Sequence, residues 1–231
     1  MKPLVKSLAN RLTGGQPAIL GRSLRSTQRE VQIARSLRKW RKALAVFDGQ
    51  TELKLNIGCG PKAKTGWVNI DFIDLPGVFK YDVRYGLPFQ DGSCSYVFHE
   101  HVLEHLEYAE GIFFLNESFR ALRPGGTLRV VLPDFQSILV AYARRDTGYF
   151  DLLKDLRLVD GMKPGDKTLI DFISYSVYQY NEHKSLWNEE KLTVLLKKAG
   201  FRSVARSSFK PETDSDYPAR MRYSLYMEAT K

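Results

Sequence analysis

Two glycines stand directly after a short apolar run, where a bound ligand could approach the backbone. Residues 55–60 read Leu-Asn-Ile-Gly-Cys-Gly, a strand pattern that leads into a turn. Gly58 and Gly60 permit positive φ angles and leave room where a Cβ would collide with a ligand. Ligands of open α/β sheets bind at the carboxyl ends of the strands, so this turn is predicted to bind one. Residues 58–63 also fit the dinucleotide pattern G-x-G-x-x-[GA].

The spacing to the next acid distinguishes between cofactors. Asp71 ends the following predicted strand, 11 residues after Gly60. The dinucleotide motif instead expects its ribose-binding acid about 20 residues further on, after a full helix. The short spacing leaves little room for that helix and counts against a nicotinamide dinucleotide. Asp71 can still accept hydrogen bonds from two ribose hydroxyls; the alternative is that it caps a turn.

Histidines supply the candidate acid–base groups. His101 follows the fourth predicted strand and is the first candidate catalytic base, and His183, before the last predicted helix, is the second. A structural role is the alternative for each, and we expect His105 to stabilise its helix. His101, Glu104 and His105 also spell H-x-x-E-H, the pattern of inverted zinc peptidases. That pattern is short and recurs by chance, so we expect no metal site.

Strands and helices must alternate to position these groups. Predicted strands occupy 53–57, 67–72, 78–83, 96–98 and 127–132, and 202–209 with 223–230 are predicted to form a closing β-pair. Predicted helices occupy 109–122, stretches between 135 and 158, and 189–198. The order strand, helix, strand indicates an α/β fold with a mostly parallel sheet and helices on both faces.

Several segments, in this order, resemble class I S-adenosylmethionine-dependent methyltransferases of the type 11 branch. They are Leu-Asn-Ile-Gly-Cys-Gly (55–60), Trp-Val-Asn-Ile-Asp (67–71), Asp-Val (82–83) with Leu-Pro-Phe-Gln-Asp-Gly-Ser (87–93), His-Val-Leu-Glu-His (101–105), Arg-Ala-Leu-Arg-Pro-Gly-Gly-Thr-Leu (120–128) and Ala-Gly-Phe (199–201). The resemblance covers about residues 51–231. It implies a Rossmann-like, mostly parallel seven-stranded sheet with an antiparallel closing strand, and an enzyme that uses S-adenosyl-L-methionine.

The resemblance also implies which residues bind the cofactor. They are Asn56, Gly58, Cys59, Gly60, Asp71, Phe72, Asp82, Val83, Phe98 and His99. The glycine turn would line the methionine part, where Phe98 and His99 would border it. Asp71 would hold the ribose, Phe72 would lie against the adenine, and Asp82 would accept from the adenine amino group beside the backbone of Val83. Asn56 stands where many relatives carry an acid.

All excess positive charge lies in the first 50 residues. This segment has 11 Lys and Arg but 2 acids, whereas residues 51–231 hold 24 basic and 24 acidic residues. We therefore divide the chain into a basic helical extension (1–50) and a methyltransferase domain (51–231). Ile33, Leu37, Trp40, Leu44 and Phe47 form an amphipathic stripe in the extension. Packing on the domain, self-association and peripheral contact with the inner membrane surface are alternatives for this stripe.

The composition restricts the function further. No apolar run is long enough to span a bilayer, and two cysteines, Cys59 and Cys94, do not make a disulfide framework. We expect a cytoplasmic protein that methylates an oxygen or nitrogen of a small-molecule, sugar or lipid-linked acceptor. The neutral domain disfavours a nucleic-acid partner. A non-catalytic basic binding module on the same fold is the alternative, with a NAD-dependent oxidoreductase and a zinc peptidase ranked below it.

Overall fold

The computed structural model describes residues 17–155, 168–214 and 223–231. It comprises two compact units, Met1–Val46 and Phe47–Lys231, each of which is described by itself. None of the described helices combines the length and the apolar character needed to cross a membrane.

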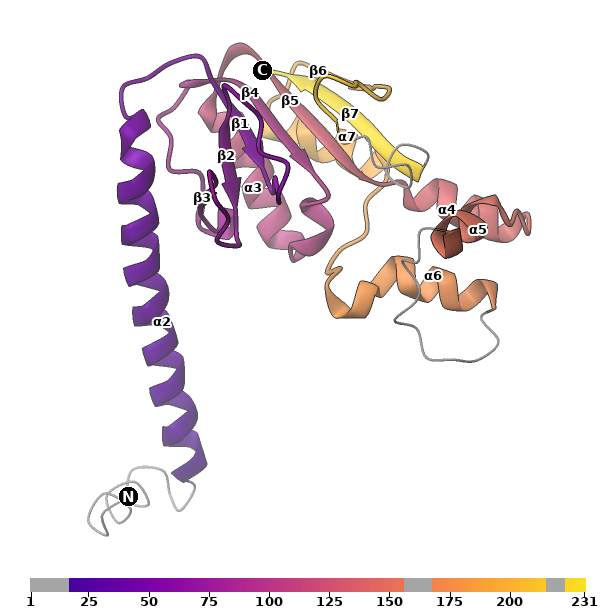
Figure 1. The fold of residues 1–231 in the computed structure, drawn as a ribbon, viewed down its shortest axis with the longest axis horizontal. Helices are drawn as coiled ribbons and strands as arrows, with labels where there is room; N and C mark the ends of the chain where they lie inside the picture. Colours follow the sequence, from indigo (N-terminus) through magenta and orange to yellow (C-terminus); the bar gives the residue numbers. More distant parts are fainter. Residues whose placement is uncertain (1–16, 156–167, 215–222) are drawn as a thin grey trace. The chain divides into compact units, whose positions relative to one another are not determined.

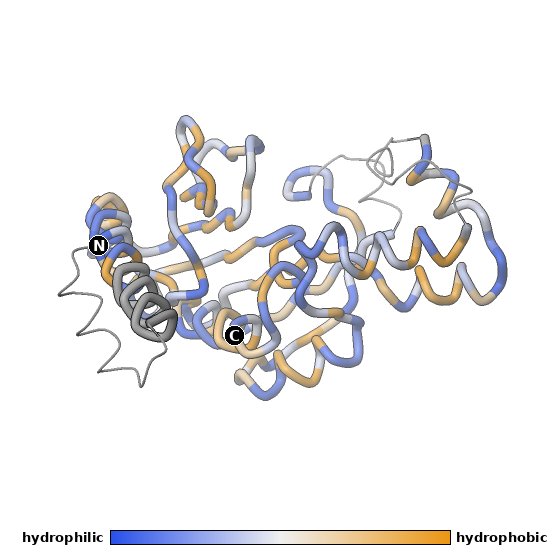
Figure 2. Tube along the Cα trace, turned by 90° about the horizontal axis from the view of Figure 1, so that it is seen from below, coloured by the Kyte–Doolittle hydropathy of each residue, from blue (hydrophilic) through white to orange (hydrophobic). Residues whose placement is uncertain are grey.

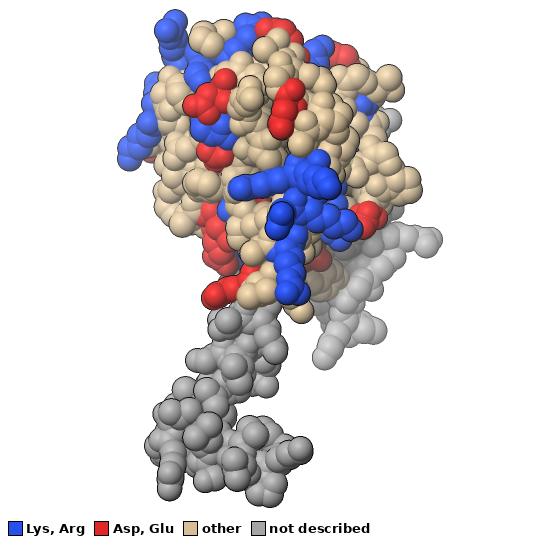
Figure 3. Space-filling view, turned by 90° about the vertical axis from the view of Figure 1, so that its left-hand side faces the viewer, with Lys and Arg blue, Asp and Glu red and all other residues tan. Residues whose placement is uncertain are grey.

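The first unit is built on one long helix, α2 (Pro17–Leu44). Pro17 is the first residue of this helix, where its missing N–H needs no partner. The predicted stripe is the less exposed face: Ile33, Leu37 and Trp40 are half-buried and Leu44 is buried. Figure 3 shows a group of Lys and Arg side chains on the face of the molecule that it presents. The exposed positions of α2 include five cations. These cations are Arg35, Arg38, Lys39, Arg41 and Lys42.

The second unit contains a seven-stranded sheet (Figure 1) in the order β3-β2-β1-β4-β5-β7-β6. Its strands are β1 (Leu53–Ile57), β2 (Val68–Asp71), β3 (Phe79–Lys80), β4 (Cys94–Glu100), β5 (Leu122–Pro133), β6 (Ser203–Arg206) and β7 (Ser224–Thr230). All neighbouring strands are parallel except at β7, which is antiparallel to both β5 and β6. The predicted fold class is therefore confirmed.

Helices and short 3-10 turns connect the strands. They are η1 (Ala45–Phe47), η2 (Val83–Tyr85), η3 (Leu103–His105), α3 (Tyr108–Ala121), α4 (Phe135–Ala143), α5 (Gly148–Asp155), α6 (Leu169–Tyr178), η4 (Gln179–Asn181) and α7 (Glu189–Ala199). The connection from β1 to β2 contains no helix, as the short spacing before Asp71 predicted. The helix predicted over 109–122 is α3, which ends at Ala121, and the Arg-Pro-Gly-Gly segment (123–126) that follows lies inside β5.

Two of these helices have clear start and stop signals and pack on one face of the sheet. Asn188 caps α7 by accepting from the N–H of Lys191 at 2.9 Å. Gly200 ends α7 with a φ of 110°, and a Cβ there would lie 2.7 Å from the ring of Phe119 on α3. The close approach of α3 and α7 therefore depends on this glycine.

The opposite face of the sheet carries a buried ion-pair network. Arg129 on β5 is fully buried, and its Nε donates to Asp214 Oδ1 at 2.6 Å. Its Nη1 lies 3.0 Å from Oε1 of Glu228, which also pairs with Lys210 at 2.6 Å. Buried charges are stable only when paired, so this network fixes the loop that contains Lys210 and Asp214 over the sheet.

Helices α4, α5 and α6 gather beyond the ends of β5 and β7 (Figure 1) and share a small core of their own. That core is formed by Phe135, Ile138, Ala141, Phe150, Leu153, Phe172 and Ile173. In the hydropathy colours of Figure 2, these helices alternate between hydrophobic and hydrophilic residues, as expected for helices with one buried face.

Candidate functional site

The turn after β1 lies at the carboxyl edge of the sheet. Both of its glycines have positive φ angles, 67° at Gly58 and 51° at Gly60. A Cβ added at Gly58 would lie 2.3 Å from Cγ2 of Val102, whereas one added at Gly60 would meet no atom within 4 Å. Gly58 is therefore required for packing against the turn after β4. Gly60 leaves open space in which a ligand can approach the backbone.

Asp71 is half-buried at the end of β2 and already accepts two backbone hydrogen bonds. Its Oδ2 accepts from the N–H of Gly60 at 2.7 Å, and its Oδ1 accepts from the N–H of Ile73 at 3.0 Å. Each carboxylate oxygen can accept more than one hydrogen bond. A capping role and a ribose-binding role, which the sequence left as alternatives, are therefore compatible.

Asp82 and Phe72 both interact with an arginine that the sequence did not single out. Asp82 is 5% exposed, and Arg84 donates to its two oxygens, from Nε at 2.9 Å and from Nη2 at 2.7 Å. The guanidinium carbon of Arg84 also lies 5.8 Å from the centre of the Phe72 ring, which is 58% exposed. An adenine amino group would share Asp82 with Arg84, beside Val83 at the start of η2.

Asn56 is buried, and its amide supports the loop between β1 and β2. Its Nδ2 donates to Oδ1 of Asn69 at 2.8 Å and to the carbonyl oxygen of Lys62 at 3.2 Å. Asn69 in turn accepts from the N–H of Lys64 at 2.7 Å. The connection between β1 and β2 has no helix. The hydrogen bonds of this asparagine pair hold the connection in place beside the glycine turn. Asn69 had no signal in the sequence beyond its position inside a predicted strand.

His101 directly follows β4 and has a positive φ of 54°. Its Nδ1 lies 2.8 Å from Oε1 of Glu104, whose side chain is fully buried. Its Nε2 lies 3.4 Å from the hydroxyl oxygen of Ser224, the first residue of β7. The imidazole is thus held on one side by a carboxylate, while 18% of its side chain stays exposed at the carboxyl edge of the sheet.

The zinc-peptidase hypothesis fails on local structure, because residues 101–105 do not form an α-helix. Only the 3-10 turn η3 is present, and the left-handed backbone of His101 precedes it. His101 and His105 are therefore not one turn apart on a helix face. The helix that we expected His105 to stabilise is also absent at this point.

His183 contacts His105 instead of standing alone. The two imidazole rings are 5.0 Å apart, and Nδ1 of His183 donates to the carbonyl oxygen of Ser176 at 2.8 Å. His183 is 9% exposed, and burial lowers its pKa. The second candidate base is thus a neutral, buried imidazole, whereas His101 is the more accessible of the two.

The family comparison matches the segment that carries most of these groups. Residues 71–130 match the family model of a methyltransferase domain, a stretch that begins at Asp71 and includes Asp82, His101 and Glu104. This part of the chain is a methyltransferase domain. The comparison with curated proteins gives no match.

Solved structures of similar proteins include three methyltransferases. A SAM-dependent methyltransferase from Archaeoglobus fulgidus is 16% identical, with 85% of this chain and 93% of that chain covered and a TM-score of 0.49. One from Thermotoga maritima is 17% identical, with 93% and 98% covered and a TM-score of 0.46. Phosphoethanolamine N-methyltransferase 2 from Haemonchus contortus, solved with S-adenosyl-L-methionine, is 15% identical, with 84% and 52% covered and a TM-score of 0.43.

The carboxyl edge of this methyltransferase fits its cofactor. The space above Gly60 would admit the methionine part, the carboxylate of Asp71 keeps free acceptor capacity, and the ring of Phe72 is exposed for stacking. Burial raises the pKa of the Cys59 thiol to about 11, so Cys59 is a neutral side chain in this turn and not a nucleophile.

Phe98 and His99, predicted to border the methionine end, have buried side chains. Phe98 is 2% exposed, and the centre of its ring lies 6.5 Å from that of Trp67. His99 is fully buried, and the centre of its ring lies 5.1 Å from that of Phe114 on α3. Burial lowers the pKa of His99 to about 4. The two side chains leave the strand on opposite faces of the sheet, and both are packed against other aromatic rings instead of being exposed at the carboxyl edge.

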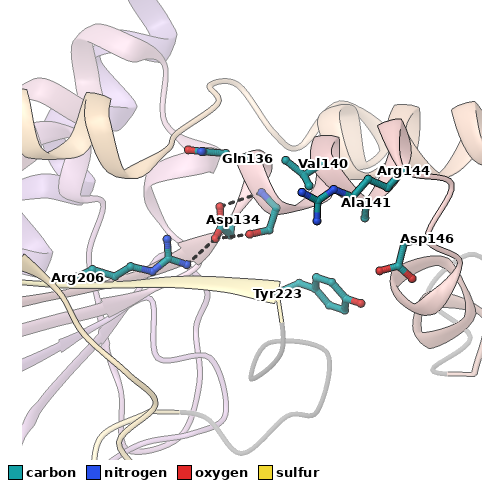
Figure 4. A pocket seen from close by; sticks show the side chains of 9 residues that line it. Asp134, Gln136, Val140, Ala141, Arg144, Asp146, Arg206 and Tyr223 are labelled. Atoms are coloured by element: carbon teal, nitrogen blue, oxygen red, sulfur yellow. Dashed lines mark hydrogen bonds and ion pairs between the residues drawn. The ribbon is translucent and has the colours of Figure 1, made fainter.

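Two cavities flank α4 at the same edge of the sheet. The first, of about 240 Å³, is shown in Figure 4, where Arg144, Asp146, Arg206 and Tyr223 surround the ion-paired Asp134. Nη2 of Arg206 lies 2.8 Å from Oδ2 of Asp134. The second, of about 430 Å³, is lined mainly by apolar side chains: Phe135, Leu139, Val140, Ala143, Leu186 and Trp187, with Gln136 and Asn188. None of the residues that line these two cavities was a predicted site residue.

Proposed function

We propose that this enzyme methylates an oxygen or nitrogen of a small-molecule, sugar or lipid-linked acceptor, and that His101 is the catalytic base. The observation that carries the proposal is the position of Nδ1 of His101, 2.8 Å from the buried carboxylate of Glu104. A base oriented by a carboxylate is the arrangement that removes a proton from a hydroxyl or an ammonium acceptor.

Glu104 sets the proton positions on this imidazole. Burial alone would raise the pKa of Glu104, but His101 beside it lowers the pKa below its usual value. With the proton of His101 on Nδ1, which faces the ionised carboxylate, Nε2 is the basic nitrogen; it lies 3.4 Å from the Ser224 hydroxyl and would take the acceptor's proton in place of that contact. General-base catalysis of this kind typically contributes about 10²–10⁴-fold in rate.

The cofactor supplies an activated methyl group on its sulfonium sulfur, and the chain supplies position. Asp71 would bind the ribose hydroxyls, Phe72 and Asp82 the adenine, and the turn at Gly58 and Gly60 the methionine part. Bringing acceptor and donor into line contributes much of the rate in such displacements. These roles agree with the contacts of each residue in the free protein.

The cavity shown in Figure 4 is our candidate for the acceptor site. Tyr223 lines it and is adjacent in sequence to Ser224, whose hydroxyl oxygen is 3.4 Å from Nε2 of His101. Its wall carries two cations, Arg144 and Arg206, and two carboxylates, Asp134 and Asp146, with Arg206 paired to Asp134. A polar acceptor suits such a wall. We further propose that residues 51–231 form the catalytic domain and that 1–50 act as a separate basic extension.

The test is methyl transfer from cofactor labelled in its methyl group to a panel of hydroxyl and amine acceptors. We expect His101→Asn to lower kcat by about 10²–10⁴-fold and to leave cofactor affinity within about twofold, because the base does not touch the nucleoside site. Tyr178→Phe, which removes a hydroxyl from an exposed side chain, is the matched control and should keep full activity.

Two outcomes would count against the proposal. Full activity in His101→Asn would remove His101 from the reaction. Cofactor binding without transfer to any acceptor would favour the alternative, a non-catalytic binding module.

A further inference from the structure

Three side chains from two distant parts of the sequence lie together in one cluster. Glu104 and His105 belong to η3, and His183 belongs to the connection between η4 and α7. One ligand atom from each lies within 4.8 Å of the other two. We call this set the Glu104 cluster. It brings one carboxylate and two imidazoles to the same point, with two of the three residues buried.

The carboxylate of this cluster has an oxygen without a hydrogen-bond partner among the described residues. Glu104 is fully buried, and its Oε2 has no hydrogen-bond partner among the described residues. Its Oε1 faces Nδ1 of His101 at 2.8 Å. A buried carboxylate is stable only when it is paired or bound to a metal ion. One oxygen of Glu104 is therefore available to a further partner, and a carboxylate oxygen of Glu104 lies within 4.8 Å of a ring nitrogen of each of the other two cluster members.

The imidazoles are oriented as metal ligands are. Nδ1 of His183 donates to the carbonyl oxygen of Ser176 at 2.8 Å, and its Nε2 is buried with no partner among the described residues. Nδ1 of His105 lies 3.3 Å from the carbonyl oxygen of Glu182. When a backbone carbonyl fixes the proton on one ring nitrogen, the lone pair of the other nitrogen is presented for coordination.

We propose that Glu104, His105 and His183 bind one divalent transition-metal ion, with Zn²⁺ as the first candidate. Two imidazoles and one carboxylate are a ligand set that zinc uses in sites with an open position for water or substrate. His105 is half-exposed, so solvent can reach the ion. The proposal goes beyond methyl transfer, does not rest on the choice of acceptor, and replaces the sequence-based expectation that no metal site exists.

The ion would have two consequences for the chain. It would neutralise the buried carboxylate, and it would fasten the α6–α7 connection to η3. That connection already docks there, because the carbonyl oxygen of Glu104 accepts from the N–H of Lys184 at 2.7 Å and from that of Ser185 at 3.2 Å. Because His101 and the ion would share Glu104, the metal site and the proposed base are adjacent.

The test uses the untagged full-length protein, freed of metal with a chelator and titrated with Co²⁺, whose absorption reports nitrogen and oxygen coordination. We expect one Co²⁺ per chain, displaced by Zn²⁺, and a higher unfolding temperature with either ion. Glu104→Gln, His105→Gln and His183→Asn should each weaken Co²⁺ binding by more than the roughly 10–100-fold that losing a supporting residue costs. Cys94→Ala, which removes a buried thiol outside the cluster, should keep the ion.

Circular dichroism first establishes that each variant is folded. His105→Gln keeps the test decisive if a buried substitution prevents folding, because His105 is half-exposed. Folded wild-type protein that takes up no stoichiometric Co²⁺ or Zn²⁺ would overturn the proposal. Undiminished binding in folded His105→Gln, or loss of the ion in Cys94→Ala, would overturn it as well.

Discussion

The backbone N–H of Gly60 donates to Oδ2 of Asp71 at 2.7 Å, which joins the turn after β1 to the end of β2. The side chain that is predicted to hold the ribose therefore also fixes the turn that is predicted to hold the methionine part. This hydrogen bond links the predicted ribose-binding residue to the predicted methionine-binding turn, so a substitution of Asp71 is expected to affect both parts of the predicted cofactor site.

Asp71→Ala should weaken binding of S-adenosylmethionine by about 1–3 kcal/mol, because it removes charge-assisted acceptors from the ribose. Calorimetric titration of the folded variant measures this loss. Asp74→Ala is the control, since Asp74 is exposed and lies 4.0 Å from Lys80, and its affinity should match that of the wild type. An unchanged affinity in folded Asp71→Ala would reduce Asp71 to a turn cap.

Gly58→Ala should destabilise the fold by about 1–3 kcal/mol, because the new Cβ would overlap Val102 and the positive φ disfavours a side chain. Urea unfolding measures the change in the free energy of unfolding. Adding Val102→Ala should recover part of the loss.

Gly60→Ala separates packing from ligand access. Its Cβ would meet no protein atom within 4 Å. The free energy of unfolding should therefore fall by only about 1 kcal/mol, the cost of placing a side chain at this positive φ angle. If the ligand occupies the space above Gly60, the free energy of cofactor binding should weaken by more than the free energy of unfolding. Equal affinity in Gly60→Ala and wild type would contradict that use of the space.

His99 should make stability depend on pH. Burial lowers its pKa to about 4 in the folded protein, whereas the unfolded chain titrates near about 6.5. As pH falls from about 6.5 to about 4, the unfolded state binds the proton first, so stability decreases across this window by up to roughly 3 kcal/mol.

The difference between wild type and His99→Phe isolates this contribution, and phenylalanine keeps the aromatic contact with Phe114. We expect the variant to lose less stability than wild type between pH 6.5 and pH 4, measured by urea unfolding at each pH. Parallel pH curves for the two proteins would show that His99 does not titrate as its burial implies.

Deleting residues 1–21 should leave cofactor affinity unchanged, because every residue assigned to the cofactor lies between Asn56 and His99. Deleting 1–49 should lower stability if the stripe from Ile33 to Phe47 is covered by the domain. Calorimetry and thermal unfolding measure the two quantities. Flotation of full-length protein with acidic liposomes, lost as salt rises, together with a fully stable 50–231 fragment, would instead assign the stripe to a membrane surface.

Local patterns in the sequence were sufficient to predict the strands, the glycine turn and the position of Asp71 at the end of a strand. Alternating apolar residues, Gly58 and Gly60 and the cap residues of α7 are short-range signals, and they act through backbone geometry that neighbouring residues fix. The strand predicted over 78–83 is present but only as the two-residue β3, and β5 begins earlier than predicted and includes Arg-Pro-Gly-Gly, because sheet pairing with neighbouring strands decides such boundaries.

Only the tertiary structure decided which side chains meet. The pairing of Asp82 with Arg84, the amide contact of Asn56 with Asn69 and the approach of His183 to Glu104 depend on how loops pack against the sheet. His183 lies 79 residues after Glu104 in the sequence, and no periodicity connects them. The H-x-x-E-H pattern suggested a helix with two facing histidines, but a left-handed residue and a 3-10 turn replaced that helix. Glu104 keeps its contact with His101, and Glu104 and His105 also lie beside His183.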